Sequence, residues 1–306
     1  MPNIARPTKP LADVNVQVQK DGSVEVVVCF MPDVDSLVGE GDSRAVLALD
    51  ASRSIKERYG GGGIFDPKPN YVQGVARKLG EILCSVTRTG KVSMLYWAMG
   101  PGGGDTEIIG DLDEAACGKA DISGPKKKNS WGTGTKMLPA IKYVCETVGK
   151  SAEFTMGVII TDGIIEDETD CMKYCMQIGK DIVDGKRKTI KLVLIGVGVE
   201  VNEEQLQRFN DMFEPTPLKG KIDLWAAGVA ADIKEEADII GILFGELMSE
   251  ETIVAATAKV VAGGKVVANF SDGLPGKFRF NVPKGCKEFS IQTPKGEVTQ
   301  DISEAL

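Results

Sequence analysis

Short apolar segments alternate with amphipathic segments between Ser43 and Ser249, and this alternation constrains the fold more than any other feature of the chain. The apolar runs Ala45–Leu49 and Phe154–Thr161 predict buried strands. Between them, Tyr71–Val86 carries apolar residues at helical spacing and predicts a helix. Strands separated by helices favour a doubly wound, mostly parallel sheet covered on both faces, which is an α/β fold.

The other elements of this region follow the same pattern. We expect further strands at Lys91–Ala98, Thr106–Leu112, Ile190–Gly198 and Ile222–Ala226, with Thr106–Leu112 at an edge of the sheet. We expect further helices at Lys136–Val148, Asp167–Val183, Glu203–Met212 and Ala231–Met248, and an irregular stretch at Asp113–Gly134.

Both ends of the chain predict antiparallel β structure. After a loose, proline-containing lead-in, Asp13–Gln19 and Val24–Phe30 flank a turn and predict a β-hairpin. Turn-rich pieces after Thr252 separate strand candidates that suggest a small β-sandwich: Ile253–Val261, Lys265–Phe270, Gly276–Asn281, Glu288–Gln292 and Glu297–Ile302. A lone hairpin is marginal in water, so we expect the hairpin to pair with this sandwich.

This reasoning predicts three segments. Residues 1–42 form the N-terminal hairpin and its connector, residues 43–249 form the α/β domain, and residues 250–306 form the C-terminal β-sandwich. The α/β domain is then inserted into, or flanked by, the small antiparallel sandwich.

Composition disfavours several classes of function. The formal net charge of −8 argues against sequence-independent binding of nucleic acid. Histidine is absent, which removes the commonest general base and the commonest transition-metal ligand. The seven cysteines lack the spacing of a zinc site, and we expect reduced, mostly buried thiols. We find no secretory signal and no apolar stretch fit to span a bilayer, so we expect a cytoplasmic protein.

Oxygen-bearing side chains stand at the ends of two predicted strands. Asp50, Ser52 and Ser54 follow the strand Ala45–Leu49, and Asp162 follows the strand Phe154–Thr161. Ligands of open α/β sheets bind beyond the carboxyl ends of the strands, so these residues should converge at one rim. Carboxylate and hydroxyl oxygens are ligands of a hard divalent cation.

Three motifs in this order resemble the von Willebrand factor A (VWA) family with its metal-ion-dependent adhesion site. They are the D-x-S-x-S segment at Asp50–Ser54, the segment Gly132–Ile141 containing Thr135, and Ile159–Gly163 containing Asp162. The resemblance implies Mg²⁺ or Mn²⁺ held directly by the hydroxyls of Ser52, Ser54 and Thr135. It implies that Asp50 and Asp162 act mainly through bound water.

The same resemblance implies a binding module and not an enzyme. A partner protein would supply an aspartate or glutamate as the missing anionic ligand of the metal. The chain resembles the intracellular bacterial tellurite-resistance subgroup of the family, which suggests a scaffold associated with an AAA-type ATPase. The residues alone do not separate Thr133 from Thr135 as ligand, and the resemblance favours Thr135. Lys136 departs from the family pattern and would either repel the ion or attract the partner's carboxylate.

Two alternatives stay open at the level of sequence. A magnesium-dependent phosphohydrolase could use Asp50 as its nucleophile, although Ser52 stands where a second carboxylate would serve as general acid. In the other alternative the site is vestigial, and the β-sandwich provides the binding surface. The basic run Lys126–Lys128 could steer an acidic partner or be simply solvated, and Trp131 could anchor an interface or lie partly buried in its loop.

Overall fold

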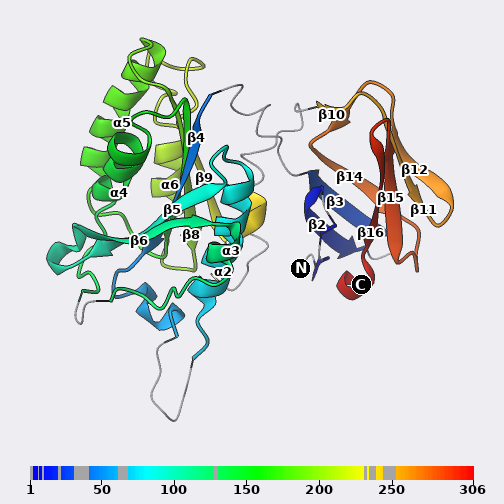
Figure 1. Cartoon of the computed structure of the whole chain (residues 1–306), viewed down its shortest axis with the longest axis horizontal. Coiled ribbons are helices and arrows are strands. Elements are labelled where there is room, and N and C mark those ends of the chain that lie inside the picture. The colour runs from blue at the N-terminus through cyan, green and yellow to red at the C-terminus, as the bar shows by residue number, and fades with distance from the viewer. Residues whose placement is uncertain are drawn as a thin grey trace. The chain divides into compact units, whose positions relative to one another are not determined.

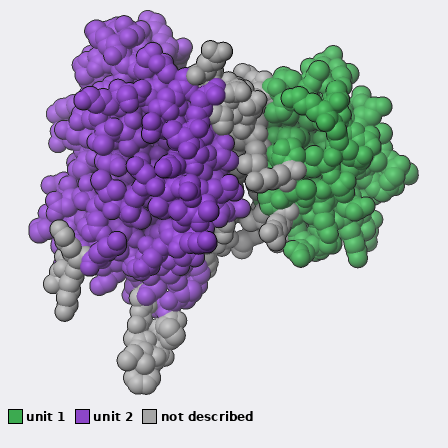
Figure 2. Space-filling model, viewed as in Figure 1, with its two compact units in different colours: residues 1–33, 243–306 green, residues 34–242 purple. Residues whose placement is uncertain are grey.

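The computed structural model describes residues 3–5, 7–8, 10–19, 22–30, 41–60, 68–126, 130–230, 233, 239–243 and 253–306. The chain divides into two compact units, shown in different colours in Figure 2. The smaller unit combines Met1–Asp33 with Leu243–Leu306, and the larger unit is Val34–Ile242.

The larger unit is built on a six-stranded, mostly parallel sheet. Its strands lie in the order β6-β5-β4-β7-β8-β9, and only the edge strand β6 runs antiparallel to its neighbour. Their bounds are β4 (Ser43–Asp50), β5 (Lys91–Met99), β6 (Asp105–Asp113), β7 (Phe154–Thr161), β8 (Thr189–Val197) and β9 (Trp225–Ala230). After β4 the chain adds β5 and β6 on one side of it, and after β7 it adds β8 and β9 on the other side of the sheet. The ends of β4 and β7 therefore form the switch point at which such folds bind ligands.

Helices cover both faces of this sheet. In Figure 1, α4 and α5 lie on one side of the sheet and α2 on the other. Alternate residues of β4, Val46 and Ala48, pack into the core cluster under the first face together with Met137, Cys171 and Phe209. The helical segments are η1 (Ile55–Arg58), α2 (Tyr71–Ser85), η2 (Pro101–Gly103), α3 (Glu114–Cys117), α4 (Leu138–Lys142), the π-helical η3 (Tyr143–Val148), α5 (Glu168–Val183) and α6 (Glu203–Asn210).

The α/β prediction is confirmed for this unit, with three local corrections. The strand at Phe154–Thr161 and the edge position of Thr106–Leu112 are found as predicted. The expected helix Lys136–Val148 starts only at Leu138 and widens into η3, where the amide of Gly149 donates to the carbonyl of Val144 over 2.8 Å. The stretch expected to be irregular contains the short helix α3.

The last strand was predicted too early in the chain. Ile222–Ala226 was expected, whereas β9 spans Trp225–Ala230 and pairs in parallel with β8 from Leu192 opposite Trp225. Position 228 of β9 needs a glycine, because a Cβ there would lie 2.8 Å from the side chain of Ile242. Ile242 belongs to a helical segment at residues 239–243, and most of the expected helix Ala231–Met248 lies outside the described residues.

Within its described residues, the smaller unit contains three antiparallel sheets. One has the order β1-β2-β3-β14, the second β12-β11-β15-β16, and the third pairs β10 with β13. The bounds are β1 (Asn3–Ile4), β2 (Leu11–Val18), β3 (Val24–Phe30), β10 (Ile253–Ala255), β11 (Ala258–Ala262), β12 (Lys265–Phe270), β13 (Leu274–Pro275), β14 (Lys277–Val282), β15 (Glu288–Thr293), β16 (Gly296–Asp301) and the short helix η4 (Ser303–Ala305).

Strands from both ends of the chain meet within this unit. β3 of the hairpin pairs antiparallel with β14, with Val28 opposite Phe278. Aromatic rings join the two larger sheets. The ring centroids of Phe280 in β14 and Phe289 in β15 lie 4.9 Å apart, and those of Phe278 in β14 and Phe270 in β12 lie 5.0 Å apart. These edge-to-face pairs bury much apolar area per side chain and contribute to the core of the unit.

Two expectations for this unit are wrong. Ile253–Val261 was predicted as one strand, but β10 pairs with β13 while β11 pairs with β12 and β15. A chain that joins two different sheets must bend between them, and the bend falls between Ala255 and Ala258. The N-terminal lead-in is not uniformly loose either, because β1 pairs with β2. Most of the expected connector before Ser43 lies outside the described residues.

Other features bear on function. None of the seven cysteines, all of which the structure describes, forms a disulfide, and all but Cys286 are buried, as predicted. None of the described helices is long and apolar enough to cross a membrane.

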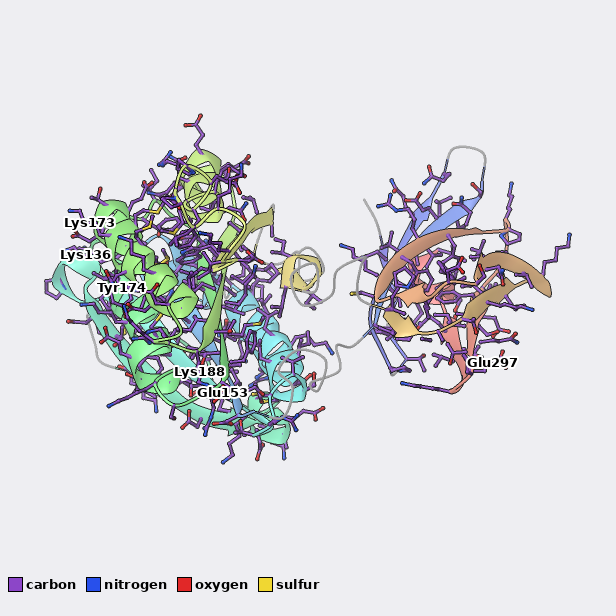
Figure 3. All side chains as sticks on the ribbon, turned by 90° about the horizontal axis from the view of Figure 1, so that it is seen from above. Lys136, Glu153, Lys173, Tyr174, Lys188 and Glu297 are labelled. Atoms are coloured by element: carbon purple, nitrogen blue, oxygen red, sulfur yellow. The ribbon has the colours of Figure 1, made fainter. Side chains whose placement is uncertain are left out.

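At the amino ends of β7 and β8, Lys188 and Glu153 form a 2.7 Å ion pair (Figure 3). Lys136, on the segment before α4, lies apart from that pair.

Candidate metal centre

Asp50 lies at the carboxyl end of β4 and is 1% exposed. Its Oδ1 accepts a 2.7 Å hydrogen bond from the backbone amide of Ser52, and its Oδ2 accepts one of 2.7 Å from the hydroxyl of Thr161. Tyr59 donates its hydroxyl to the carbonyl of Asp50 over 2.7 Å. These contacts fix the carboxylate at the point where β4 and β7 end.

A series of hydrogen bonds connects the two strand ends. The hydroxyls of Ser52 and Ser54 lie 2.9 Å apart, and the Ser54 hydroxyl donates to Oδ1 of Asp162 over 2.7 Å. Asp162 directly follows β7. The structure therefore brings Asp50, Ser52, Ser54 and Asp162 together at the switch point of the sheet. Asp50 and Thr161, the residue before Asp162, are 111 positions apart in the chain.

The two candidate threonines differ in environment. Thr135 is 8% exposed, and a Cβ built on Gly163 would lie 3.8 Å from the Thr135 hydroxyl and 3.9 Å from the Ser54 hydroxyl. Thr133 is exposed, and its hydroxyl accepts a 2.8 Å hydrogen bond from the amide of Gly102. The Thr135 hydroxyl thus lies near the serine–aspartate series, whereas the Thr133 hydroxyl is bonded to the amide of Gly102.

Electrostatics set both carboxylates apart from ordinary surface acids. Burial, together with the charge of Asp162, raises the pKa of Asp50 to about 6, although the hydrogen bonds from Ser52 and Thr161 partly oppose the rise. Burial also raises the pKa of Asp162, against the hydrogen bond from Ser54. A buried carboxylate beside a second carboxylate, each with a raised pKa, fits a nearby cation.

Backbone contacts hold the loops around these residues. The amide of Arg53 donates to the carbonyl of Gly132 over 3.0 Å, and the amide of Gly132 donates to the carbonyl of Ala51 over 2.9 Å. Gly103 approaches the next part of this loop so closely that a Cβ on it would lie 1.8 Å from the carbonyl oxygen of Gly134. This close approach and a positive φ angle explain the glycine at position 103.

Sequence reasoning missed Asp167 as a residue that positions the site. Its Oδ1 accepts from the amide of Met137 over 2.8 Å, and its Oδ2 accepts from the amide of Leu138 over 3.0 Å. The neighbouring amide of Glu166 donates to the carbonyl of Thr135 over 2.9 Å. By sequence, Asp167 resembles an acidic cap of the helix that it precedes, but its side chain caps α4 and fastens the Thr135 segment to the loop after β7.

Trp131 and Lys136 flank the site. Trp131 is half-buried, its ring lies 5.1 Å from that of Tyr59, and the ammonium of Lys56 lies 5.9 Å from the ring centroid. Lys136 is exposed, and its Nζ would lie 3.8 Å from a Cβ on Gly102. Of the basic run Lys126–Lys128, the last two residues lie outside the described part of the chain.

The donor set is suited to one class of metal. The described residues contain no group of three or more Cys, Asp or Glu that could hold a metal ion, and the chain has no histidine. At this site the donors are two carboxylates and three neutral hydroxyls. Such an all-oxygen set fits Mg²⁺ or Mn²⁺ and lacks the histidine and cysteine ligands typical of zinc.

Comparisons with known proteins give likenesses of structure. No protein-family model matches the chain, and no curated protein matches its sequence. The crystal structure of the SpRpn10 VWA domain is similar with a TM-score of 0.42 and 12% identity, over 65% of this chain and 94% of that chain. The pilus adhesin RrgA from Streptococcus pneumoniae gives a TM-score of 0.21 and 10% identity, over 97% of this chain and 41% of that chain.

Proposed function

We propose that this chain is a metal-dependent protein-binding module. The site at Asp50, Ser52, Ser54, Thr135 and Asp162 would bind Mg²⁺ or Mn²⁺ and, through the ion, a carboxylate of a partner protein. The observation that supports this most is the hydrogen-bonded series Ser52–Ser54–Asp162, which gathers oxygen donors from two strands at the switch point of the sheet.

The balance of charge explains why a partner's acid would complete the site. The bound ion would offer a Lewis-acidic position for an aspartate or glutamate side chain. Ser52, Ser54 and Thr135 would contribute neutral oxygens, while Asp50 and Asp162 would act through water. Asp50 is suited to an indirect role, because both its carboxylate oxygens already accept hydrogen bonds. Three neutral ligands leave much of the cation's charge available to the incoming carboxylate.

Several finer statements belong to the same proposal. The three motifs support membership of the VWA family with a metal-ion-dependent adhesion site, in a subgroup similar to the tellurite-resistance proteins. That resemblance suggests a cytoplasmic scaffold and a link to an AAA-type ATPase. We also propose that residues 43–249 are a module inserted into a β-sandwich made of both chain ends, which the pairing of β3 with β14 supports.

We favour binding over catalysis. A phosphohydrolase would need Asp50 as an exposed nucleophile, whereas the residue is 1% exposed and its two carboxylate oxygens accept hydrogen bonds from Ser52 and Thr161. Turnover of generic phosphate esters by the wild type, lost in Asp50→Asn, would reverse this preference.

Calorimetric titration of Mg²⁺ into chelator-treated protein tests the metal site. We expect the wild type to bind and Asp162→Ala to lose roughly ten-fold or more in affinity. Asp170→Ala is the matched control, because Asp170 is an exposed acid of α5 that forms a 3.9 Å ion pair with Lys173 on the same helix. Equal binding by the wild type and Asp162→Ala would remove the proposed site.

Capture of partners from native lysate tests the binding function. We expect at least one captured protein to be released by a chelator and to be missing with Asp162→Ala. Capture that survives both the chelator and the substitution would instead support a vestigial site and binding through the β-sandwich.

A further inference from the structure

A pocket of about 470 Å³ adjoins the candidate metal centre within the larger unit. Ser54 and Asp162 line this pocket and also belong to the metal centre. Its other walls come from the segment between β4 and α2, from the first residue of α2, and from the end of β8 and the residues that follow it. A ligand held at the metal centre would therefore have the pocket directly beside it.

The charged side chains of the pocket balance one another. Lys68 and Glu57 form a 2.6 Å ion pair. Arg58 and Glu200 act in opposite directions on Asp162, since Arg58 lowers its pKa and Glu200 raises it. Apart from Asp162, the lining holds two basic and two acidic residues. The pocket thus offers no excess charge to a second charged group of a ligand.

Two of the apolar side chains that line the pocket are exposed. Val199 is 98% exposed and Tyr71 is 38% exposed, and both line the pocket. Ile164, two residues after Asp162, is 56% exposed. All three stand at the carboxyl edge of the sheet, where α2 begins and where β7 and β8 end. Exposed apolar side chains gathered beside a polar site mark an interaction surface.

We propose that this pocket receives an apolar side chain adjacent in sequence to the partner's metal-binding carboxylate. The recognised segment of the partner is then an aspartate or glutamate next to leucine, isoleucine, valine, methionine or phenylalanine. This rests on the proposed function, because the carboxylate at the metal sets the position of the neighbouring residue. Consecutive Cα atoms of a peptide are about 3.8 Å apart, so the side chain next to the carboxylate reaches a pocket that begins at Ser54 and Asp162 where the peptide backbone turns at the metal centre.

A displayed library of random peptides, selected on the full chain with Mg²⁺, tests the proposal. We expect enriched peptides to carry an acidic residue next to a large apolar residue. A synthetic peptide from that selection should bind Val199→Ser and Tyr71→Ser roughly ten-fold more weakly than the wild type, since each substitution removes apolar contact area. Both variants should bind Mg²⁺ as the wild type does, because neither position belongs to the metal centre.

Val183→Ser provides the matched control. Val183 is 38% exposed at the end of α5, remote from the pocket in the chain, and its replacement should leave peptide affinity unchanged. Three outcomes would overturn the proposed role of the pocket while leaving the metal centre intact. The enriched peptides could lack an adjacent apolar residue, or a chain that binds Mg²⁺ could enrich no peptide. Val199→Ser could also bind the selected peptide as tightly as the wild type does. Failure of the wild type to bind Mg²⁺ would instead overturn the proposed function itself.

Discussion

The hydroxyl of Thr161 lies 2.7 Å from Oδ2 of Asp50 and joins the last residue of β7 to the last residue of β4. Both residues are buried, and the bond crosses the switch point of the sheet. The same hydroxyl accepts a 3.3 Å hydrogen bond from the amide of Gly163, so it also orders the turn that carries Asp162. Thr161 is thus a positioning residue for both carboxylates of the candidate metal centre.

Thr161→Val should weaken magnesium binding and destabilise the fold. Valine keeps the shape but leaves Oδ2 of Asp50 without its donor, which costs about 1–3 kcal/mol for a buried charged acceptor. The pKa of Asp50 should rise further, and Mg²⁺ affinity near neutral pH should fall several-fold. Urea unfolding and calorimetric titration measure the two effects.

Thr155→Val is the control for that substitution. Thr155 is also buried in β7, but its hydroxyl has no hydrogen-bond partner among the described residues. Replacing it should be neutral or stabilising, with Mg²⁺ affinity unchanged. Equal losses in both variants would show that the Thr161 hydroxyl has no special role.

The metal-free protein should lose stability as the pH rises through the range in which Asp50 ionises. The pKa of Asp50 is raised from 3.8 to about 6 on folding, so the folded state holds the proton more tightly than the unfolded state. The stabilisation is complete below about pH 4 and is lost by about pH 6, and it amounts to roughly 3 kcal/mol. Urea unfolding in chelator at about pH 4 to 7, corrected by the same series on Asp50→Asn, isolates this contribution.

Mg²⁺ should reverse this loss of stability with rising pH. Binding requires ionised Asp50, so the stabilisation conferred by Mg²⁺ should grow from about pH 5 to about pH 7 in the wild type and be absent in Asp50→Asn. Asp50→Asn should also be more stable than the wild type near neutral pH in chelator, because it removes a buried charge. A metal-free wild type whose stability is the same as that of Asp50→Asn across this range would contradict the raised pKa.

Adjacent glycines of the η2 loop should respond in opposite ways to alanine. Gly103 has a φ of +67°, and its Cβ would lie 1.8 Å from the carbonyl oxygen of Gly134, so Gly103→Ala should cost more than about 2 kcal/mol and loosen the segment before Thr135. Gly104 has a φ of −96° and no atom within 4 Å of a Cβ. Gly104→Ala should be neutral or stabilise by up to about 1 kcal/mol. Thermal unfolding of the two variants measures the difference.

Local sequence patterns suffice for four of the five residues of the candidate site, all except Thr135. Apolar runs that stop at an acid mark the ends of two parallel strands, and this pattern alone places Asp50 and Asp162 at one rim of the sheet. The spacing of Ser52 and Ser54 after Asp50 is likewise a local pattern. These features depend on residues close together in the chain, where hydrophobic period and side-chain chemistry are informative.

The rest depended on contacts between distant segments. The different environments of Thr133 and Thr135 depend on the hydrogen bond from the amide of Gly102 to the Thr133 hydroxyl and on the backbone bond from Glu166 to Thr135, and neither contact leaves a local signal. The same holds for β9, whose bounds are set by pairing with β8, and for Ile253–Val261, which divides between two sheets. Local propensity is overridden wherever a partner strand decides the register.

Asp167 offers the clearest test of such a distant contact. Asp167→Ala should leave the amides of Met137 and Leu138 without their acceptor, which removes the cap of α4 and costs about 1–2 kcal/mol. Because the Thr135 segment is fastened by this cap, Mg²⁺ affinity should fall as well, by roughly ten-fold. Asp167→Asn retains one acceptor oxygen and should recover part of both losses.

Asp170→Ala, about one turn further along α5, controls for the loss of a negative charge and should change stability by less than about 0.5 kcal/mol. Urea unfolding and magnesium titration of the three variants separate the possibilities. If Asp167→Ala loses stability but binds Mg²⁺ like the wild type, then the cap supports only the helix and Thr135 is not held for the metal. If affinity falls in Asp167→Ala and returns in part with Asp167→Asn, the carboxylate positions Thr135 through the backbone that it caps.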